Sequence, residues 1–338
     1  MKRRSRIISK RSVAGPDPRP SRRWFYLLAL FLAWAGLEGG LQLAGLAARW
    51  VFRPQLAHPG APTILCLGDS HTFGVGVPAD RGYPAQLEQL LADRGITVNV
   101  VNLGAPGTNT SQIRCHLPEW IQRFRPSVIV VLAGANDGWN SSEVLMVDWE
   151  DGVLKGQPGK LWRARMLNIL SHLKSYRLAA YLFRHTERDR REVEQARDRK
   201  GRSVLHDYNP QDASPEPYAD AKRAFRNLCR MAETARSHQV SLILMTYVGV
   251  PPVTFETVND VLRQAARSCS MPLVDNDQIL HPLLVDQAGL VNTDLRNALF
   301  FPDMHPTAQG YQRIADNLAR FLIEQHLLPR AEARSDKP

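Results

Sequence analysis

Short apolar runs, often β-branched, alternate along this chain with longer stretches in which apolar residues recur every three or four positions. The short runs predict five strands, at 63–67, 98–103, 127–132, 240–246 and 272–275. The longer stretches predict helices at 84–94, 111–124, 217–238, 257–268 and 306–326. The segment 292–301 follows neither period and is predicted to be a loop.

Strands that alternate with helices are typical of a parallel sheet, because each crossover between parallel strands needs a connecting segment that is usually a helix. The strand runs are mostly apolar, as expected for strands covered on both faces. We therefore predict an α/β domain of three layers, with a five-stranded parallel sheet between two layers of helices. In such a sheet ligands bind beyond the carboxyl ends of the strands, so residues that directly follow strands are the candidates for chemistry.

The region 139–215, between the third and fourth strands, is too long for a simple connection. Several aromatic residues lie in its first half, among them Trp149, Trp162, Tyr176, Tyr181 and Phe183. We interpret this half as a lid or a helical insertion. The stretch 186–202 is almost entirely polar and charged, which predicts a solvated helix or a disordered segment, and the tail 329–338 is also predicted to be disordered.

The segment 24–48 is a candidate membrane anchor. Its apolar residues are uninterrupted from 24 to 37, and the polar residues Glu38 and Gln42 follow. As a helix it is about 37 Å long, enough to cross a bilayer if Glu38 has a protein or water partner. Fourteen uninterrupted apolar residues also suit a signal peptide, and Gly45-Leu46-Ala47 is a candidate cleavage site. Because no cleavage site stands out, we expect a retained transmembrane helix rather than a cleaved signal or the core helix of a cytoplasmic protein.

Charge fixes the orientation of this anchor. Nine of the 43 Lys and Arg residues lie in the first 23 positions, and the rest of the chain is close to neutral. Basic residues before an apolar segment stay in the cytoplasm, so the chain after the anchor is exported. The segment 21–25, Ser-Arg-Arg-Trp-Phe, also looks like a twin-arginine export signal. The net charge of +10 thus has a membrane explanation, and no nucleic-acid-binding motif accompanies it.

The predicted map has a cytoplasmic tail at 1–23, the anchor at 24–48, a linker at 49–62 and an extracytoplasmic domain at 63–328, periplasmic if the cell is Gram-negative. The four cysteines are Cys66, Cys115, Cys229 and Cys269. They have neither CxxC spacing nor a metal-ligand pattern, so we expect no metal and no cofactor. Export permits a disulfide, whereas Cys66 lies in a predicted core strand where a small buried residue is the commoner role.

Polar or glycine-containing clusters follow the first three predicted strands. Gly68-Asp69-Ser70 follows the first strand, Gly104 the second, and Asn136 the third. Taken singly, each is also an ordinary turn or helix cap, and we expect Asp69 to be a turn and helix-start residue. The next residue, Asp137, is interpreted as structural support.

A fourth cluster, Asp303-Met304-His305-Pro306, precedes the last predicted helix, and Pro306 suits its first turn. A histidine at this place can project over the strand ends and accept a proton near neutral pH, and an acidic neighbour would hold its tautomer. His71 is a rival base because it follows Ser70 directly, but adjacent side chains diverge. We expect His71 at most to line the site.

Together, in this order and spacing, the four clusters resemble the SGNH hydrolases, a branch of the GDSL esterases and lipases. The resemblance covers about 63–327 without the insertion and implies the flavodoxin-like fold of that family. It also implies that Ser70 is the nucleophile and His305 the general base, and that the oxyanion hole consists of the backbone amide of Ser70 with Gly104 and Asn136. Asp303 takes the role of the orienting acid.

One departure from the family concerns this acid. Many relatives place it three residues before the histidine, where this chain has Pro302. Asp303 is two residues before His305, a spacing that other members use, and a backbone carbonyl is the alternative partner of His305.

The implied activity is ester hydrolysis through an acyl-enzyme, outside the cytoplasm and without a cofactor. The motifs do not name the ester: O-acetyl groups of envelope polysaccharide, other small-molecule esters, and lipids or lysophospholipids are all candidate substrates. Two alternatives stay open. One is acyl transfer to a sugar hydroxyl, which related domains perform, and the other is an anchored, non-catalytic binding module.

Overall fold

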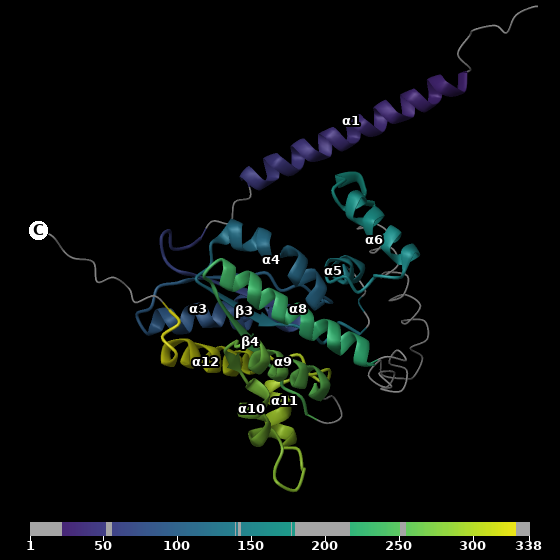
Figure 1. Cartoon of the computed structure of the whole chain (residues 1–338). Helices are drawn as coiled ribbons and strands as arrows, with labels where there is room; N and C mark the ends of the chain where they lie inside the picture. Colours follow the sequence, from purple (N-terminus) through teal and green to yellow (C-terminus); the bar gives the residue numbers. More distant parts are fainter. Residues whose placement is uncertain are drawn as a thin grey trace, which may run out of the picture. The chain divides into compact units, whose positions relative to one another are not determined.

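The computed structural model describes residues 22–51, 56–138, 140, 143–176, 178–179, 217–250 and 255–328. The chain divides into two compact units, of which the first contains the N-terminal helix with residues near 168–179 and the second contains the sheet (Figure 1). The stretch 186–202, the tail 329–338, Tyr181 and Phe183 lie outside the described residues, as does the basic tail up to residue 21.

The N-terminal helix α1 (Arg22–Val51) is continuous through the predicted anchor. Its part Arg23–Ala47 is long and apolar enough to cross a membrane. Its large apolar side chains are exposed, including Trp24 and Phe25, which a core helix of this chain would bury.

Glu38, the acidic residue of α1, has protein partners within the first unit. Its carboxylate accepts hydrogen bonds from the backbone amides of Lys174 and Ser175, each at 2.8 Å, and from the Gln42 side chain at 2.6 Å. The hydroxyl of Ser175 accepts a hydrogen bond from the Trp34 indole at 3.3 Å. A carboxylate on an apolar helix is costly in a bilayer unless it is hydrogen-bonded, and these bonds supply the partner that the sequence required.

The second unit contains one sheet of five parallel strands in the order β2-β1-β3-β4-β5. The strands are β1 (Thr63–Gly68), β2 (Asn99–Asn102), β3 (Val128–Leu132), β4 (Ser241–Met245) and β5 (Leu273–Val274). β1 and β3 are buried along their whole length, which explains their unbroken apolar pattern. All five predicted strands are confirmed, and the strand order is that of a flavodoxin-like, doubly wound sheet.

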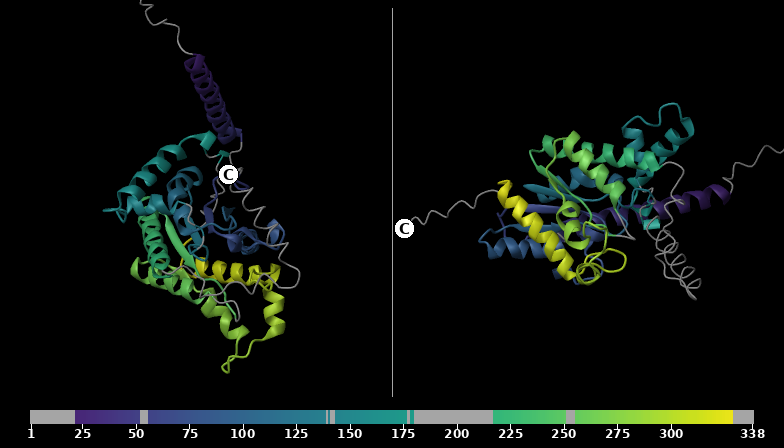
Figure 2. Two further views of the ribbon diagram at one scale, coloured as in Figure 1. Left: turned by 90° about the vertical axis from the view of Figure 1, so that its right-hand side faces the viewer. Right: turned by 90° about the horizontal axis from the view of Figure 1, so that it is seen from below.

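Helices cover both faces of this sheet. α3 (Tyr83–Asp93) and α12 (Ala308–Glu324) pack together on one face, and α4 (Thr110–Phe124), α8 (Pro217–Ser237) and α9 (Glu256–Ser268) cover the other (Figures 1 and 2). Each of them matches a predicted helix. The predicted three-layer α/β/α fold is therefore confirmed.

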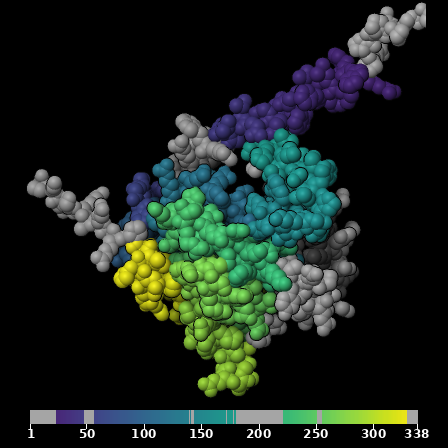
Figure 3. All heavy atoms as spheres, viewed as in Figure 1, coloured from purple at the N-terminus to yellow at the C-terminus, as the bar shows by residue number. Residues whose placement is uncertain are grey.

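The last part of the sheet domain differs from the prediction. Residues 292–301 were expected to be a loop, but α11 (Thr293–Leu299) lies there, and its N-cap Asn292 accepts a hydrogen bond from the amide of Leu295 at 3.1 Å. α11 is too short to display a helical period, and Asn292 has the composition of a turn. α10 (Asn276–Leu284) was not predicted either, and both helices project from the body of the second unit (Figure 3).

The final helix also begins later than expected. Pro306 lies in a β-bridge with Phe300 rather than in a first helical turn. The N-cap is Thr307, whose hydroxyl accepts a hydrogen bond from the amide of Gly310 at 3.3 Å, and the helix starts at Ala308.

The insertion contains α5 (Val144–Glu150) and α6 (Pro158–Ser171). After α5, the Asp151 carboxylate receives two hydrogen bonds from the Arg114 guanidinium of α4, at 2.8 and 2.9 Å. Burial acts to raise the pKa of Asp151, but Arg114 together with Arg230 and Arg226 outweighs burial, so the pKa lies below its ordinary value. This ion pair ties the start of the insertion to the helical layer.

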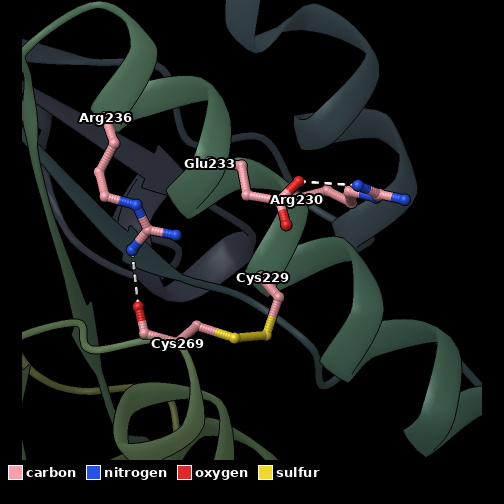
Figure 4. Close-up of a disulfide and its surroundings, with 5 residues drawn as sticks. All are labelled: Cys229, Arg230, Glu233, Arg236 and Cys269. Atoms are coloured by element: carbon pink, nitrogen blue, oxygen red, sulfur yellow. Dashed lines mark hydrogen bonds and ion pairs between the residues drawn. A yellow bond between two sulfur atoms is a disulfide. The ribbon is translucent and has the colours of Figure 1, made fainter.

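Two of the cysteines form a disulfide. Cys229 of α8 is bonded to Cys269 at the end of α9, with their Cα atoms 5.6 Å apart (Figure 4). Arg236 of α8 donates a hydrogen bond to the carbonyl oxygen of Cys269 at 2.7 Å. Cys66 is a free, buried residue of β1, as expected, and Cys115 is also free.

Candidate active site

The turn after β1 presents Ser70. Asp69 is the N-cap of the short helix α2 (Ser70–Phe73) and accepts a hydrogen bond from the His71 amide at 2.9 Å, which confirms its helix-start role. Ser70 is the first helical residue, so its backbone amide has no acceptor within the helix. Gly68 is required in front of it, because a Cβ atom at this position would lie 2.2 Å from the carbonyl oxygen of Leu132.

The loop before α12 presents Asp303 and His305. It is closed by a hydrogen bond from the Phe301 amide to the His305 carbonyl oxygen at 2.8 Å. Met304, between the two, has φ of 64°, in the left-handed region that costs a non-glycine residue about 1 kcal/mol or more. Its side chain is fully buried in a small apolar cluster with Phe300, among others. The buried Met304 therefore holds the loop in a conformation that turns the Asp303 and His305 side chains toward each other.

Ser70, His305 and Asp303 meet at the carboxyl end of the sheet. Nε2 of His305 lies 2.8 Å from Oγ of Ser70, although the residues are 235 positions apart in the chain. Oδ2 of Asp303 lies 3.0 Å from Nδ1 of His305, a contact that becomes an ion pair when His305 is protonated. The other carboxylate oxygen of Asp303 accepts a hydrogen bond from the His305 amide at 3.2 Å.

The electrostatics of the site favour a neutral His305. Burial lowers the pKa of His305, repulsion from His71 lowers it further, and the attraction of Asp303 only partly compensates. For Asp303, burial acts to raise the pKa, but the His305 amide and the charge of its ring outweigh burial and leave the pKa below its ordinary value. At neutral pH the pair therefore consists of an ionised carboxylate and an imidazole that is free to accept a proton.

Gly104 and Asn136 lie beside the Ser70 turn. A Cβ atom at position 104 would lie 2.4 Å from the Phe73 backbone nitrogen, so only glycine permits the turn after β2 to approach α2 this closely. The Gly104 amide donates to Oδ1 of Asn102 at 2.9 Å. The Asn136 side-chain amide donates to the Thr108 carbonyl oxygen at 3.0 Å and to Oδ2 of Asp69 at 3.3 Å.

Two further residues of the site were not identified from the sequence as parts of it. Tyr247, just after β4, donates its hydroxyl to Oδ2 of Asp69 at 2.7 Å, and burial, reinforced by the Asp69 charge, raises its pKa well above the ordinary value. It therefore remains a donor to a carboxylate that is 1% exposed. Phe255 packs edge-on against the ring of His71. The position of Tyr247 after a strand was the only available signal.

Asp137, which was predicted to give structural support, lies beside the start of α4. Asp137 is buried and accepts hydrogen bonds from the backbone amide of Thr110, at 2.9 Å, and from its hydroxyl, which supports the start of α4. In the part of the chain that the structure describes, no three His, Cys, Asp or Glu side chains are grouped so that they could hold a metal ion.

The sequence of the chain also matches the model of a known protein family. The model of the GDSL-like lipase/acylhydrolase family matches residues 66–313, which is more than half of the chain. The chain belongs to the GDSL-like lipase/acylhydrolase family. The resemblance that the four motif clusters indicated is thereby confirmed, and the match runs from β1 into α12 and includes every candidate site residue.

Two relatives of this GDSL-like protein have curated names. It is 33% identical over 98 residues to the esterase TesA of Pseudomonas aeruginosa, and 26% identical over 118 residues to an arylesterase of Vibrio mimicus. These alignments cover 29% and 35% of this chain and 47% and 52% of the relatives. The chain thus spans about half the length of the curated relatives that it matches.

Solved structures with low sequence identity also match this GDSL-like chain. A crystal structure of TesA is 18% identical with a TM-score of 0.44, covering 79% of this chain and 99% of that chain. An acetylxylan esterase, Axe2 of Geobacillus stearothermophilus, is 16% identical with a TM-score of 0.45, covering 78% and 94%.

Proposed function

We propose that this GDSL-like protein is a serine ester hydrolase that works through an acyl-enzyme on Ser70. The contact that carries the proposal is the 2.8 Å approach of Ser70 Oγ to His305 Nε2, with Asp303 at the other ring nitrogen. A serine hydroxyl becomes a useful nucleophile when an adjacent base takes its proton. The neutral state of His305 suits that base near neutral pH.

In the first half of the reaction, the Ser70 hydroxyl gives its proton to Nε2 of His305 while Oγ bonds to the ester carbonyl carbon. The carbonyl oxygen becomes an oxyanion, and Asp303 stabilises the imidazolium. When the bond to the alcohol breaks, His305 returns the proton to the leaving oxygen and the acyl group remains on Ser70. In the second half, water gives a proton to His305 and attacks the acyl carbon. His305 then returns this proton to Oγ of Ser70 as the bond to the acyl group breaks, and the acid and free Ser70 are released.

The oxyanion needs donors aimed at it, and the backbone amide of Ser70, Gly104 and Asn136 are assigned this role. Asn136 has to exchange a hydrogen bond that its side-chain amide donates, to Thr108 or to Asp69, for a bond to the oxyanion. Gly104 must likewise turn its amide away from Asn102. Loss of one such donor is expected to lower kcat by about 100-fold or more.

We further propose that α1 is a retained anchor and that the sheet domain lies outside the cytoplasm. The basic residues before α1 favour this orientation. The bond between Cys229 and Cys269 also supports it, because disulfides persist in oxidising compartments. The intact mass of protein extracted from membranes tests retention: the full-length mass is expected, and a chain cut after Gly45-Leu46-Ala47 would contradict it.

The substrate is proposed to be a small-molecule, glycan or lipid ester. Relatives named esterase and arylesterase support ester cleavage without naming an acyl group. A chain-length series of p-nitrophenyl esters, with the full chain in detergent micelles, tests both the activity and its preference. Preference for acetyl would favour glycan deacetylation, and preference for long chains would favour lipids.

The Ser70→Ala variant in the same series is expected to lose about a thousandfold or more in kcat. Equal activity of the variant and the wild type would contradict the proposed function. A sugar acceptor added to the assay distinguishes hydrolysis from acyl transfer, because a transferase would form a sugar ester and an enzyme that only hydrolyses would release the same acid as before.

A further inference from the structure

His71 is a buried titratable residue that the proposed mechanism does not use. Its side chain is on α2, directly after Ser70, and the residue is 7% exposed. Neither ring nitrogen has a hydrogen-bond partner, and Nδ1 lies 3.5 Å from Oδ1 of Asp69. A buried imidazole without a hydrogen bond is costly and calls for an explanation.

The ring contacts of His71 lead directly to the base. Its imidazole stacks on that of His305, with ring centroids 4.6 Å apart and planes inclined by 25°. On its other sides, His71 meets Tyr247 at 5.0 Å and Phe255 at 5.5 Å, both edge to face. Tyr247 and Phe255 in turn stack on each other at 4.9 Å. His71 is thus held by two aromatic rings and presents a flat surface to His305.

We propose that His71 is a positioning residue for His305: its ring supports the plane of the base, and its closeness to His305 keeps the two rings from being protonated together. The first part follows from the stack, because a ring packed flat on another has little freedom to rotate away from Ser70. The second follows from proximity, since two imidazolium ions at this distance repel each other in a largely buried site. The proposal rests on the proposed roles of Ser70 and His305.

The groups that face His71 agree with this role. Asp69, at the start of α2, is the nearest opposite charge, but its oxygens already accept hydrogen bonds from the His71 amide, the Tyr247 hydroxyl and the Asn136 amide. Tyr247, after β4, is neutral, and His305, before α12, is the other titratable ring. Repulsion by His71 also contributes to the low pKa of His305. His71 thereby keeps the base unprotonated further into the acidic range.

Two substitutions separate the support given by the ring from the repulsion between the two imidazoles. His71→Phe keeps a flat ring and removes the titratable nitrogens, so the acid limb of kcat/KM is expected to move to higher pH while the ring still supports His305. His71→Leu removes both, and kcat at pH 8 is expected to fall by about tenfold with KM unchanged, because the base is less well aligned. His116→Phe is the matched control, since His116 packs against the Trp120 ring on α4, and it should change neither quantity.

A direct measurement does not depend on turnover. Full-length protein labelled with ¹³Cε1-histidine, in detergent micelles, reports the pKa of His305 by NMR titration, with the resonance assigned by its loss in His305→Gln. A higher pKa of His305 in His71→Phe than in the wild type supports the proposal, and an equal pKa overturns it. If His71→Phe does not fold, His71→Gln provides the same comparison.

The outcomes separate this proposal from the proposed function. If the pKa of His305 responds to His71 while Ser70→Ala keeps full esterase activity, the proposed function fails and the coupling of the two histidines stands. If Ser70→Ala is inactive but kcat and the pH profile are unchanged in both His71 variants, the esterase stands and His71 is only a packing residue.

Discussion

Replacement of Asp303 by asparagine tests how His305 is held. Asparagine keeps an oxygen that can accept the hydrogen bond from the His305 amide, so the loop should keep its shape. The change removes one negative charge, 3.0 Å from Nδ1 of His305. The variant therefore isolates the electrostatic contribution of Asp303 to the imidazolium that the proposed mechanism forms.

The expected loss of kcat in Asp303→Asn follows from this distance and from the exposure of Asp303. Two unit charges 3.0 Å apart attract by about 1.4 kcal/mol in water and by about 5.5 kcal/mol at an effective dielectric constant of about 20. The Asp303 side chain is 49% exposed, so solvent screening favours the lower part of this range. We expect a loss of about 1.5–3 kcal/mol, which corresponds to about a 10- to 100-fold lower kcat.

The assay is kcat/KM for a p-nitrophenyl ester as a function of pH. Because Asp303 raises the pKa of His305, Asp303→Asn should also move the acid limb to lower pH. Asp294→Asn, an exposed acid on α11, is the matched control and should behave as the wild type. If Asp303→Asn keeps the wild-type kcat and pH profile, Asp303 is not the orienting acid, and a backbone carbonyl becomes the better candidate.

Three further predictions concern the whole domain. The acid limb of wild-type kcat/KM should have its midpoint below pH 6.5, because burial and then His71 lower the pKa of His305 from that value. Replacing Cys229 and Cys269 by serine opens a link between residues 40 positions apart and should lower stability by about 4 kcal/mol and Tm by about 8–15 °C. Arg114→Ala leaves the Asp151 carboxylate buried without its main partner and should lower the free energy of unfolding in urea by about 2–4 kcal/mol.

Matched variants and one pH series check these predictions. Cys115→Ser removes a free thiol and should leave Tm nearly unchanged, and Arg123→Ala should cost less than Arg114→Ala. The Asp151 contribution is present above the ordinary carboxyl pKa of 3.8 and is lost as the pH falls through the lower pKa of the folded state. An Arg114→Ala penalty that is the same at pH 7 and pH 3 would contradict the ion-pair interpretation.

The sheet could be predicted from the sequence because its strands are buried on both faces. A run such as Thr63–Gly68 has no polar residue after Thr63, and the helices between strands are long enough to show a period. The prediction missed the short helix α11 for the opposite reason. Thr293–Leu299 spans about two turns and begins with residues that are equally common in loops. Pro306 was predicted in a helical turn because proline suits the first turn of a helix. The bridge that Pro306 forms with Phe300 has no signature in the sequence pattern.

Most of the candidate site was visible because its residues follow strands or precede a helix, where the fold brings them to one edge of the sheet. The short spacing between Asp303 and His305 was explained only by the structure, since it depends on the left-handed conformation and buried side chain of Met304. The stack of His71 on His305 was also beyond the sequence. Nothing local distinguishes a histidine that faces solvent from one enclosed by Tyr247 and Phe255.

Labelling by a fluorophosphonate probe tests the central claim most directly, because the probe reacts with an activated serine and reports no other part of the mechanism. Full-length protein in detergent micelles is treated with the probe, and the modified peptide is located by mass spectrometry. The expected result is one label, on Ser70, that is absent from Ser70→Ala and retained in the control Ser127→Ala. Undiminished labelling of Ser70→Ala, or hydrolysis without any label on Ser70, would contradict the assignment of Ser70 as the nucleophile.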